Sequence, residues 1–262
     1  IETASSAKLP ELLSMPEAMR VIAKPKLEAA LARHDLQSTE RLHLSLALLS
    51  NDPTQLEYLQ KRLLNAEAHQ VPLLVNQLLP FRDAIQSPLW SAAESGDSES
   101  LLPAACALAK MDPHNDRWSG ISARIAERLV RENPLRLAVW VEELRPVANS
   151  LNPSLQVIYT SAPSSRSQTE IDLATDILES YAKDDLALLH ELVLTGESHQ
   201  FRKMFSSYQR VPQQAKEALR AELTRPVPMR ESLLESEERT RSRVAAMARQ
   251  ANAAVALLRL QD

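Results

Sequence analysis

The chain has 262 residues, of which 44% are apolar and only 4% aromatic, and it carries three glycines and a single cysteine. So few glycines exclude the many turns of a sheet protein and a glycine-rich phosphate loop, and one cysteine excludes an intrachain disulfide. The formal net charge of −4 is unevenly spread. Residues 1–199 hold 18 Lys and Arg against 27 Asp and Glu, a net of −9, whereas residues 200–262 hold 12 against 7, a net of +5.

The apolar residues recur with helical spacing along almost the whole chain, and the expected helix boundaries are good to a few residues. In chain order, the predicted helices are 9–22, 26–35, 38–50, 54–66, 71–85, 88–95, 97–111, 117–132, 134–148, 153–161, 168–182, 185–195, 198–209, 212–224 and 230–260.

Prolines mark several of the expected helix starts. Asp or Asn stands directly before four of them, and Pro is tolerated in the first turn of a helix that such a residue caps. Helix starts are therefore predicted near Pro53, Pro72, Pro113, Pro134 and Pro153.

One short segment recurs at long range. LALLSND at 46–52 returns as CALAKMD at 106–112, and weaker matches are DILESYAKD at 176–184 and ALLRLQD at 256–262. A long period built from helical pieces is the signature of a stacked helical array.

A second pair of segments follows the same repeat. QVPLLVNQLLP at 70–80 matches RLAVWVEELRP at 136–146, and Leu63 corresponds to Leu129 at the same offset. The repeating unit then has 60 to 70 residues and four helices. We therefore predict an all-α fold, an α-solenoid of HEAT-like helical hairpins wound as a right-handed superhelix.

The expected domain organisation is a HEAT-like α-solenoid at 1–225, followed at 226–262 by a linker and a C-terminal helix that continues the array. Residues 161–167 are expected to form an exposed turn. On the last helix, Glu235 with Arg239 and Glu237 with Arg241 stand four residues apart, the favourable order for ion pairs.

The end of the last helix is apolar and rich in Ala. A terminal helix of an array normally carries a polar outer face. We therefore expect either that the chain is a piece of a longer protein or that this helix pairs with another copy, which would make a homo-oligomer.

Residues that could carry chemistry are few. No two histidines stand three to five residues apart, and the serine, kinase and phosphate-loop motifs are absent. Asp112 and the polar residues up to Asp116 are interpreted as a helix-capping loop rather than a metal site. Cys106 and the tryptophans at 90, 118 and 140 are interpreted as core residues. The sequence thus predicts no catalytic, metal or cofactor-binding residue.

Three phrases carry a resemblance to a known family: DPTQLEYLQKRLL at 52–64, RENPLRLAVWVEELRP at 131–146 and RQANAAVALLRL at 249–260. They resemble a HEAT-like helical region of large bacterial multidomain proteins of planctomycete type. In those proteins the region accompanies a Ser/Thr protein kinase domain, a formylglycine-generating-enzyme-like (sulfatase-modifying factor) domain, or both. The resemblance implies a non-catalytic arm of a signalling protein.

The expected function is a protein–protein interaction or regulatory scaffold in the cytoplasm, with no enzyme activity of its own, no cofactor and no membrane partner. Arg239, Arg241 and Arg243 are the candidate residues for binding an acidic protein partner. One alternative is a HEAT-like nucleic-acid-binding or DNA-repair module that uses the basic C-terminal part; it would bind duplex DNA in a salt-dependent way. Another is an all-helical enzyme, which would need polar groups converging on one cavity.

Overall fold

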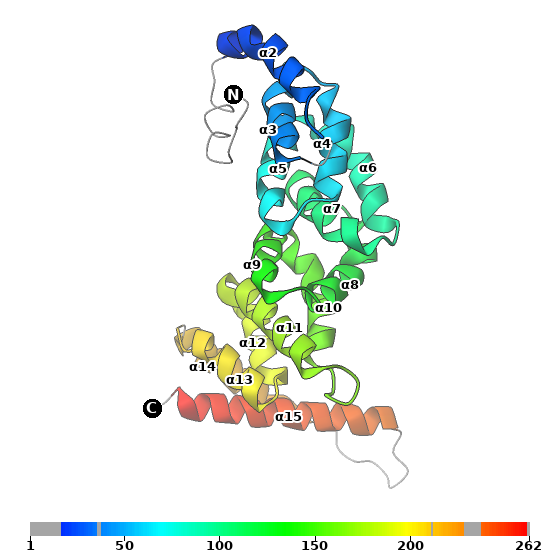
Figure 1. The fold of residues 1–262 in the computed structure, drawn as a ribbon. Coiled ribbons are helices and arrows are strands. Elements are labelled where there is room, and N and C mark those ends of the chain that lie inside the picture. Colours follow the sequence, from blue (N-terminus) through cyan, green and yellow to red (C-terminus); the bar gives the residue numbers. More distant parts are fainter. Residues whose placement is uncertain (1–16, 36–37, 211, 228–236, 261–262) are drawn as a thin grey trace. The chain divides into compact units, whose positions relative to one another are not determined.

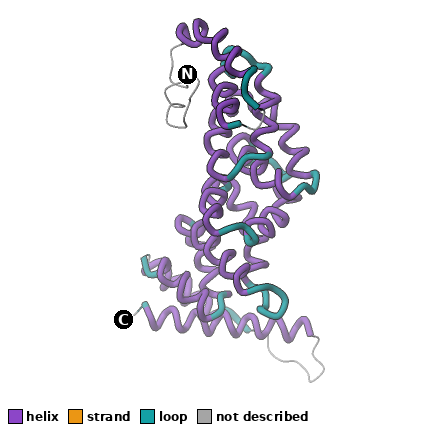
Figure 2. The backbone as a smooth tube through the Cα atoms, viewed as in Figure 1, coloured by secondary structure: helices purple, strands orange, loops and turns teal. Residues whose placement is uncertain are grey.

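The computed structural model describes residues 17–35, 38–210, 212–227 and 237–260, and within these ranges it contains helices and loops but no strand (Figure 2). The predicted all-α class is confirmed. Two compact units make up the structure. The first comprises the described residues up to Arg117 together with Asn133–Val147, and the second comprises Trp118–Glu132 and the described residues from Ala148 onward. The predicted domain boundary after residue 225 stays a prediction.

The first unit is built around α7, in which almost every residue from Ser100 to Ala109 is buried. Helices α4, α5, α6 and α9 pack against it. The elements of this unit (Figure 1), with η for a short 3-10 helix, are α2 (Glu17–Leu31), α3 (Thr39–Leu48), α4 (Gln55–Leu64), η2 (Ala68–Gln70), α5 (Val71–Leu78), η3 (Leu79–Phe81), α6 (Arg82–Glu94), α7 (Ser98–Met111), α9 (Pro134–Glu143) and η4 (Arg145–Val147).

The second unit has its core around α12, whose residues Leu192, Val193 and Leu194 are fully buried. Helices α13 and α15 pack against α12, and α14 packs against α15. The elements of this unit are α8 (Trp118–Leu129), α10 (Ala148–Tyr159), α11 (Gln168–Tyr181), η5 (Ala182–Asp184), α12 (Leu186–Thr195), α13 (Ser198–Tyr208), α14 (Pro212–Thr224) and α15 (Glu237–Arg259).

Four pairs of consecutive helices, spaced four helices apart along the chain, pack on each other. In the first unit α2 packs on α3 and α6 on α7, and in the second unit α10 packs on α11 and α14 on α15. The segments matched in the sequence also have equivalent local structures. Pro80 and Pro146 each lie in a 3-10 turn that follows an α-helix, and Leu63 and Leu129 are both fully buried near the end of a helix. These similarities are local, and the four-helix repeat stays a prediction.

Most of the predicted helices are present within a few residues of their expected bounds. Pro134 follows the capping residue Asn133 as the first residue of α9, and Pro72 lies in the first turn of α5, as predicted. Residues 161–167 form the predicted loop. The predicted helix at 71–85 is instead interrupted by η3.

Three prolines lie inside helices where the sequence predicts a boundary. Pro25 lies within α2 and Pro88 within α6, so the predicted breaks before them are wrong; α10 begins at Ala148 rather than near Pro153. An interior proline costs about 3 kcal/mol because it removes one hydrogen bond and crowds the preceding turn. In α10 the flanking Leu151 and Leu155 are fully buried, each contributing about 1.5 to 3 kcal/mol. Such burial on both sides outweighs the local cost.

Several helices have an N-cap residue whose side chain accepts a hydrogen bond from the first turn. Before α7, a glycine in the loop precedes this N-cap residue. Gly96 has a φ of +93°, which L side chains rarely adopt, and it connects α6 to Asp97, whose carboxylate accepts from the first turn of α7. Other side-chain caps are Ser38 of α3, Asn133 of α9, Ser167 of α11 and Asp185 of α12, and α13 begins with a capping box of Glu197 and Gln200.

Candidate functional site

Helix α15 carries the three arginines that the sequence predicts as partner-binding residues. It runs without a break from Glu237 to Arg259 (Figure 1). Arg239 and Arg241 are exposed and Arg243 is half-buried. Helical spacing places Arg239 and Arg243 on one side and Arg241 on another, so the three do not share one face.

Of the two ion pairs predicted on this helix, one is confirmed and one lies partly outside the described residues. Arg241 Nη2 lies 3.0 Å from Glu237 Oε2, and both side chains are exposed. Glu235, the expected partner of Arg239, is not among the described residues. An exposed pair at this spacing contributes a few tenths of a kcal/mol.

On the inner face of α15, Arg249 forms ion pairs with two neighbouring helices. Arg249 donates from Nη2 to Glu191 Oε2 on α12 over 2.9 Å, and from Nε to Glu222 Oε1 on α14 over 2.9 Å. The hydrogen bond from Arg249 lowers the pKa of Glu222, against the opposing effect of burial. Arg249 therefore links α15 to α12 and to α14. Its ion pair with Glu222 is largely removed from solvent, whereas Glu191 is partly exposed.

Two amides complete this attachment. Asn252 Nδ2 donates to the carbonyl oxygens of Leu194 over 2.9 Å and Gly196 over 3.1 Å, and Gln250 Nε2 donates to the carbonyl of Arg225 over 2.7 Å. Ala253, Ala256 and Leu257 are buried beside them. The rotation of α15 about its own axis is therefore fixed by specific contacts.

The opposite face of α15 is apolar but exposed. Val244, Met247, Val255 and Leu258 are 58%, 57%, 42% and 65% exposed, and with Ala251 they recur at three and four residues. We call these five residues the outer stripe. A helix with apolar residues on two opposite faces is typical of one covered on both sides, because a surface helix normally keeps its outer face polar.

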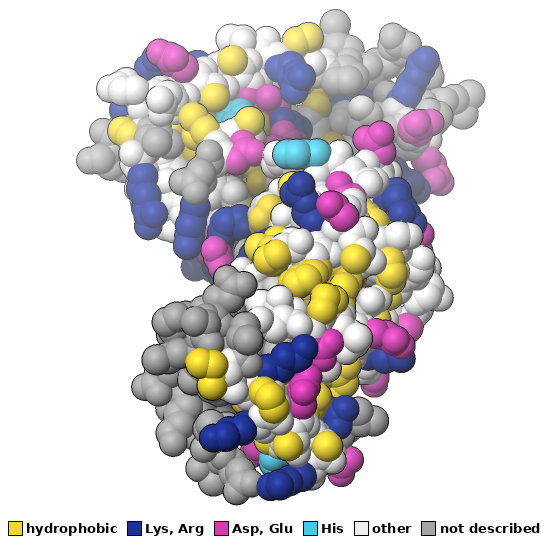
Figure 3. All heavy atoms as spheres, turned by 90° about the horizontal axis from the view of Figure 1, so that it is seen from above, with side chains coloured by type: hydrophobic (Ala, Val, Ile, Leu, Met, Phe, Trp, Pro, Cys, Tyr) yellow, Lys and Arg dark blue, Asp and Glu magenta, His cyan; other side chains and the backbone are white. Residues whose placement is uncertain are grey.

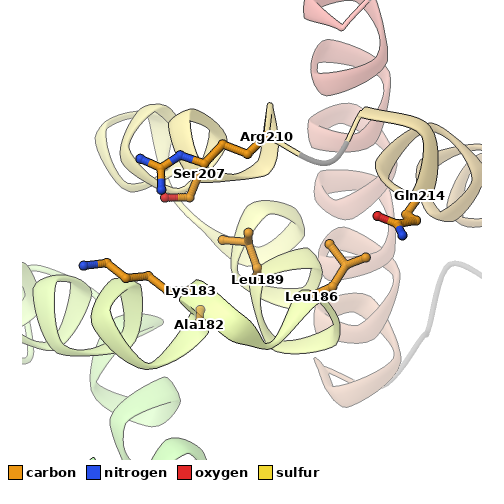
Figure 4. Close-up of a pocket in the computed structure, with 7 residues that line it drawn as sticks. All are labelled: Ala182, Lys183, Leu186, Leu189, Ser207, Arg210 and Gln214. Atoms are coloured by element: carbon orange, nitrogen blue, oxygen red, sulfur yellow. The ribbon is translucent and has the colours of Figure 1, made fainter.

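A pocket of about 240 Å³, here called the slot, opens in the second unit between η5, α12, α13 and α14 (Figure 4). In Figure 4 the Lys183 and Arg210 side chains both extend toward the left of the view, and Gln214 lies on the right, beyond Leu189 and Leu186. The full lining is Ala182, Lys183, Leu186, Leu189, Ser207, Arg210 and Gln214.

The two cations of the slot have no ion pair with an acidic side chain among the described residues. Two acids near Lys183 in sequence have other partners: Glu179 Oε2 lies 3.6 Å from Lys203 Nζ, and the Asp185 carboxylate accepts from the backbone of α12 over 2.9 Å. Arg210 has no acid three or four residues away. None of the seven residues that line the slot is acidic, so the lining itself carries only positive charge.

The sequence analysis names no residue of the slot. Its lining is drawn from residues 182–214, which lie on η5, α12, α13, α14 and the turn after α13, and none of these residues stands out in its local sequence. The lack of an acid one turn from Arg210 is the one local signal, and it is too common to indicate a site.

The polar residues at 112–116 form a helix-ending loop, as interpreted from the sequence. Asp112 ends α7, and its carboxylate accepts hydrogen bonds from Trp90 Nε1 over 3.0 Å, from Asn115 Nδ2 over 2.7 Å and from Gln86 Nε2. The part of the chain that the structure describes contains no group of three or more His, Cys, Asp or Glu arranged for a metal ion. Burial raises the pKa of Asp112, but these hydrogen bonds together outweigh it, so the pKa is lowered.

We expect Asp112→Ala to destabilise the first unit by about 2 kcal/mol at pH 7, because the buried indole N–H of Trp90 would lose its acceptor. Since the folded pKa is lowered, this contribution is present above the unfolded pKa of about 4 and is lost as the pH falls through the folded value. Urea unfolding followed by tryptophan fluorescence at pH 7 and pH 3 measures both effects.

Asp83→Ala, which removes a highly exposed acid from α6, is the matched control and should change stability by no more than a few tenths of a kcal/mol. An equal loss in Asp112→Ala at both pH values would contradict the proposed role of the carboxylate.

The residues interpreted as core residues from the sequence are buried. Trp90, Trp118 and Trp140 are all buried in their units, and Cys106 is completely buried in α7. Burial raises the pKa of the Cys106 thiol far above its usual value, and the negative charge of Glu143 raises it further. These side chains therefore stabilise the helix packing and are not available to a partner.

Charged side chains of both signs are interspersed on the face that Figure 3 presents, with apolar side chains between them. None of the helices in the described ranges combines the length and the apolar character that crossing a membrane requires. Comparison of the chain with protein-family models, with curated proteins and with solved structures gives no match.

Proposed function

We propose that this chain is a non-catalytic protein-binding segment of a larger bacterial signalling protein, with the architecture of an α-solenoid of HEAT-like hairpins wound as a right-handed superhelix. The recurrence of packed helix pairs every four helices supports the repeat architecture. The likeness of three segments to planctomycete-type multidomain proteins supports the setting in a larger protein.

The observation that carries the proposal is the outer stripe of α15. Its apolar side chains point away from the buried residues of the same helix, and the contacts of Arg249, Asn252 and Gln250 hold the helix in that orientation. The stripe is thereby presented to solvent by a fixed support. Fully burying one such side chain against a partner contributes about 1.5 to 3 kcal/mol to the free energy of binding. An apolar helix face or groove of a partner protein can therefore bind here.

A photo-crosslinking amino acid placed on α15, in the natural full-length protein in its own cells, tests this function. We expect a discrete crosslinked protein from Met247 and from Val255, both in the stripe, because they would lie inside the interface. Ala245 is exposed on the same helix but off the stripe, so the same probe there should give none.

A charge within the stripe should disrupt the contact. Leu258→Glu is expected to lower the crosslink from Met247 by about tenfold, because an interface must exclude or pair a buried charge. The exposed position of Leu258 leaves the fold intact, which circular dichroism would verify. Equal crosslinking at stripe and control positions, no crosslink at all, or a nucleic-acid adduct would contradict the proposal.

A further inference from the structure

We propose that the slot is a binding site for a carboxylate that carries a short aliphatic body, the chemistry of the C-terminal residue of a peptide. The proposal is separate from the function proposed for α15, because none of the seven lining residues belongs to that helix. It rests on the placement of charge and of apolar surface in one small cavity.

The cationic end of the slot favours an anion. Lys183 lies in η5 and Arg210 in the turn after α13, and both side chains extend toward the same side of the view (Figure 4). A guanidinium binds the two oxygens of a carboxylate in a fork, and an ammonium adds a third donor. Ser207 also lines the slot, and its hydroxyl can donate a further hydrogen bond.

The floor of the slot favours an aliphatic group next to that anion. Leu189 and Ala182 are buried, and the half-buried Leu186 continues the apolar surface toward Gln214. Gln214, in the first turn of α14, can donate to and accept from a peptide bond, and the positive end of that helix adds to the attraction for an anion. Inorganic phosphate alone would leave the apolar floor uncovered.

The size of the slot suits about one residue of a ligand. Pockets for drug-sized molecules begin at roughly 300 Å³, and this one holds about 240 Å³. A terminal Leu or Val with its carboxylate suits such a space, and the preceding peptide bond would reach Gln214. An internal Asp or Glu side chain shares the carboxylate but not the adjoining aliphatic branch.

Titration of the chain by NMR, with the backbone amides of residues 182–214 assigned, tests the site. The probes are N-acetyl-leucine, its uncharged amide N-acetyl-leucinamide, an Ala-Ala-Leu peptide with a free or an amidated C-terminus, and inorganic phosphate. We expect both free carboxylates to shift slot resonances with a dissociation constant on the order of 1 mM, and the two amides to bind at least about tenfold more weakly.

Substitutions separate the slot from general charge attraction. Lys183→Gln and Arg210→Gln should each weaken binding of N-acetyl-leucine by about fivefold to tenfold, and neither should unfold the chain, since both side chains are exposed. Arg220→Gln is the matched control, because it removes one exposed positive charge from α14 outside the slot and should leave binding unchanged.

Several results would overturn the assignment. These are equal binding of N-acetyl-leucine and its amide, equal or tighter binding of phosphate, equal binding of a blocked peptide whose only carboxylate is a Glu side chain, and equal weakening by Arg220→Gln. Loss of the crosslinks from α15 would leave this assignment standing, and failure of the titration would leave the function of α15 standing.

Discussion

Replacing Gly196 with Ala should destabilise the second unit by about 3 kcal/mol. A Cβ at this position would overlap the hydroxyl oxygen of Tyr159, and it would lie 3.0 Å from the carbonyl oxygen of Leu192 and 3.2 Å from Gln200 Cβ. Tyr159 is almost completely buried and donates to that Leu192 carbonyl over 2.8 Å. The cost combines overpacking, about 1 to 3 kcal/mol, with a disturbed buried hydrogen bond.

The reason for glycine here is close approach rather than backbone conformation. The φ of Gly196 is −73°, which any residue adopts. Hydrogen exchange should show faster exchange in α12 and α13 of the Ala variant, with α6 and α7 of the first unit unchanged. Adding Tyr159→Phe should recover part of the lost stability because it removes the overlapping oxygen, although the contact with Gln200 would remain.

Gly120→Ala is the matched control, and it should act in the opposite direction. Gly120 lies in α8, its added Cβ would have no neighbour within 4 Å, and Ala has the higher helix propensity. We expect a gain of about 0.5 kcal/mol. If Gly196→Ala were as stable as Gly120→Ala, the close packing of Tyr159 against Gly196 would be disproved.

Replacing Arg249 with Met should cost the second unit about 3 kcal/mol and loosen α15. Met keeps much of the apolar stem but leaves Glu222, which is nearly buried, and Glu191 without their shared cation. Removing one partner of a buried ion pair costs about 3 to 5 kcal/mol, and the partial exposure of Glu191 places this case at the lower end. Urea unfolding measures the loss, and hydrogen exchange should show faster exchange in α15.

The cause can be checked by also removing the charge of Glu222, which would keep only its pair with the exposed Arg225 at 3.4 Å. Arg249→Met combined with Glu222→Gln should be more stable than Arg249→Met alone, because the amide is cheaper to bury than the carboxylate. The loss should also shrink in acid: the pKa of Glu222 is lowered, so its contribution is present above about pH 4.5 and is lost as the pH falls through the folded value.

Arg241→Met is the matched control on the same helix. Arg241 pairs with Glu237 at 3.0 Å, but both are exposed, so its loss should change stability by no more than a few tenths of a kcal/mol. Equal losses in the two Met variants, or no recovery with Glu222→Gln, would show that Arg249 contributes packing rather than charge.

The candidate site was only partly predictable. The sequence points to α15 as the element that needs a partner, and the exposure of Val244 and Leu258 agrees with that interpretation. It favours the arginines as contact residues, but in the structure Arg241 lies on a different side from Arg239 and Arg243. The slot was invisible in the sequence, because Lys183 and Arg210 share a cavity only through the packing of η5 and α12 with α13.

The sequence by itself determined the helical class and the positions of most helices. These features depend on signals within a few turns of chain: apolar spacing as in α4, a capping residue such as Asn133 before Pro134, and the matched prolines at 80 and 146. Each can be recognised without knowing which helix lies beside which.

Only the tertiary structure decided the continuity of α2, α6 and α10 through their prolines, the need for glycine at residue 196, and the direction in which α15 presents its apolar residues. Each depends on contacts between residues that are distant in sequence. The Tyr159 hydroxyl meets Gly196 from a different helix, and Arg249 meets Glu191 across 58 positions. Local helix propensity changes the stability of a helix by a few kcal/mol at most. The burial of side chains between helices contributes more than that to the free energy of folding.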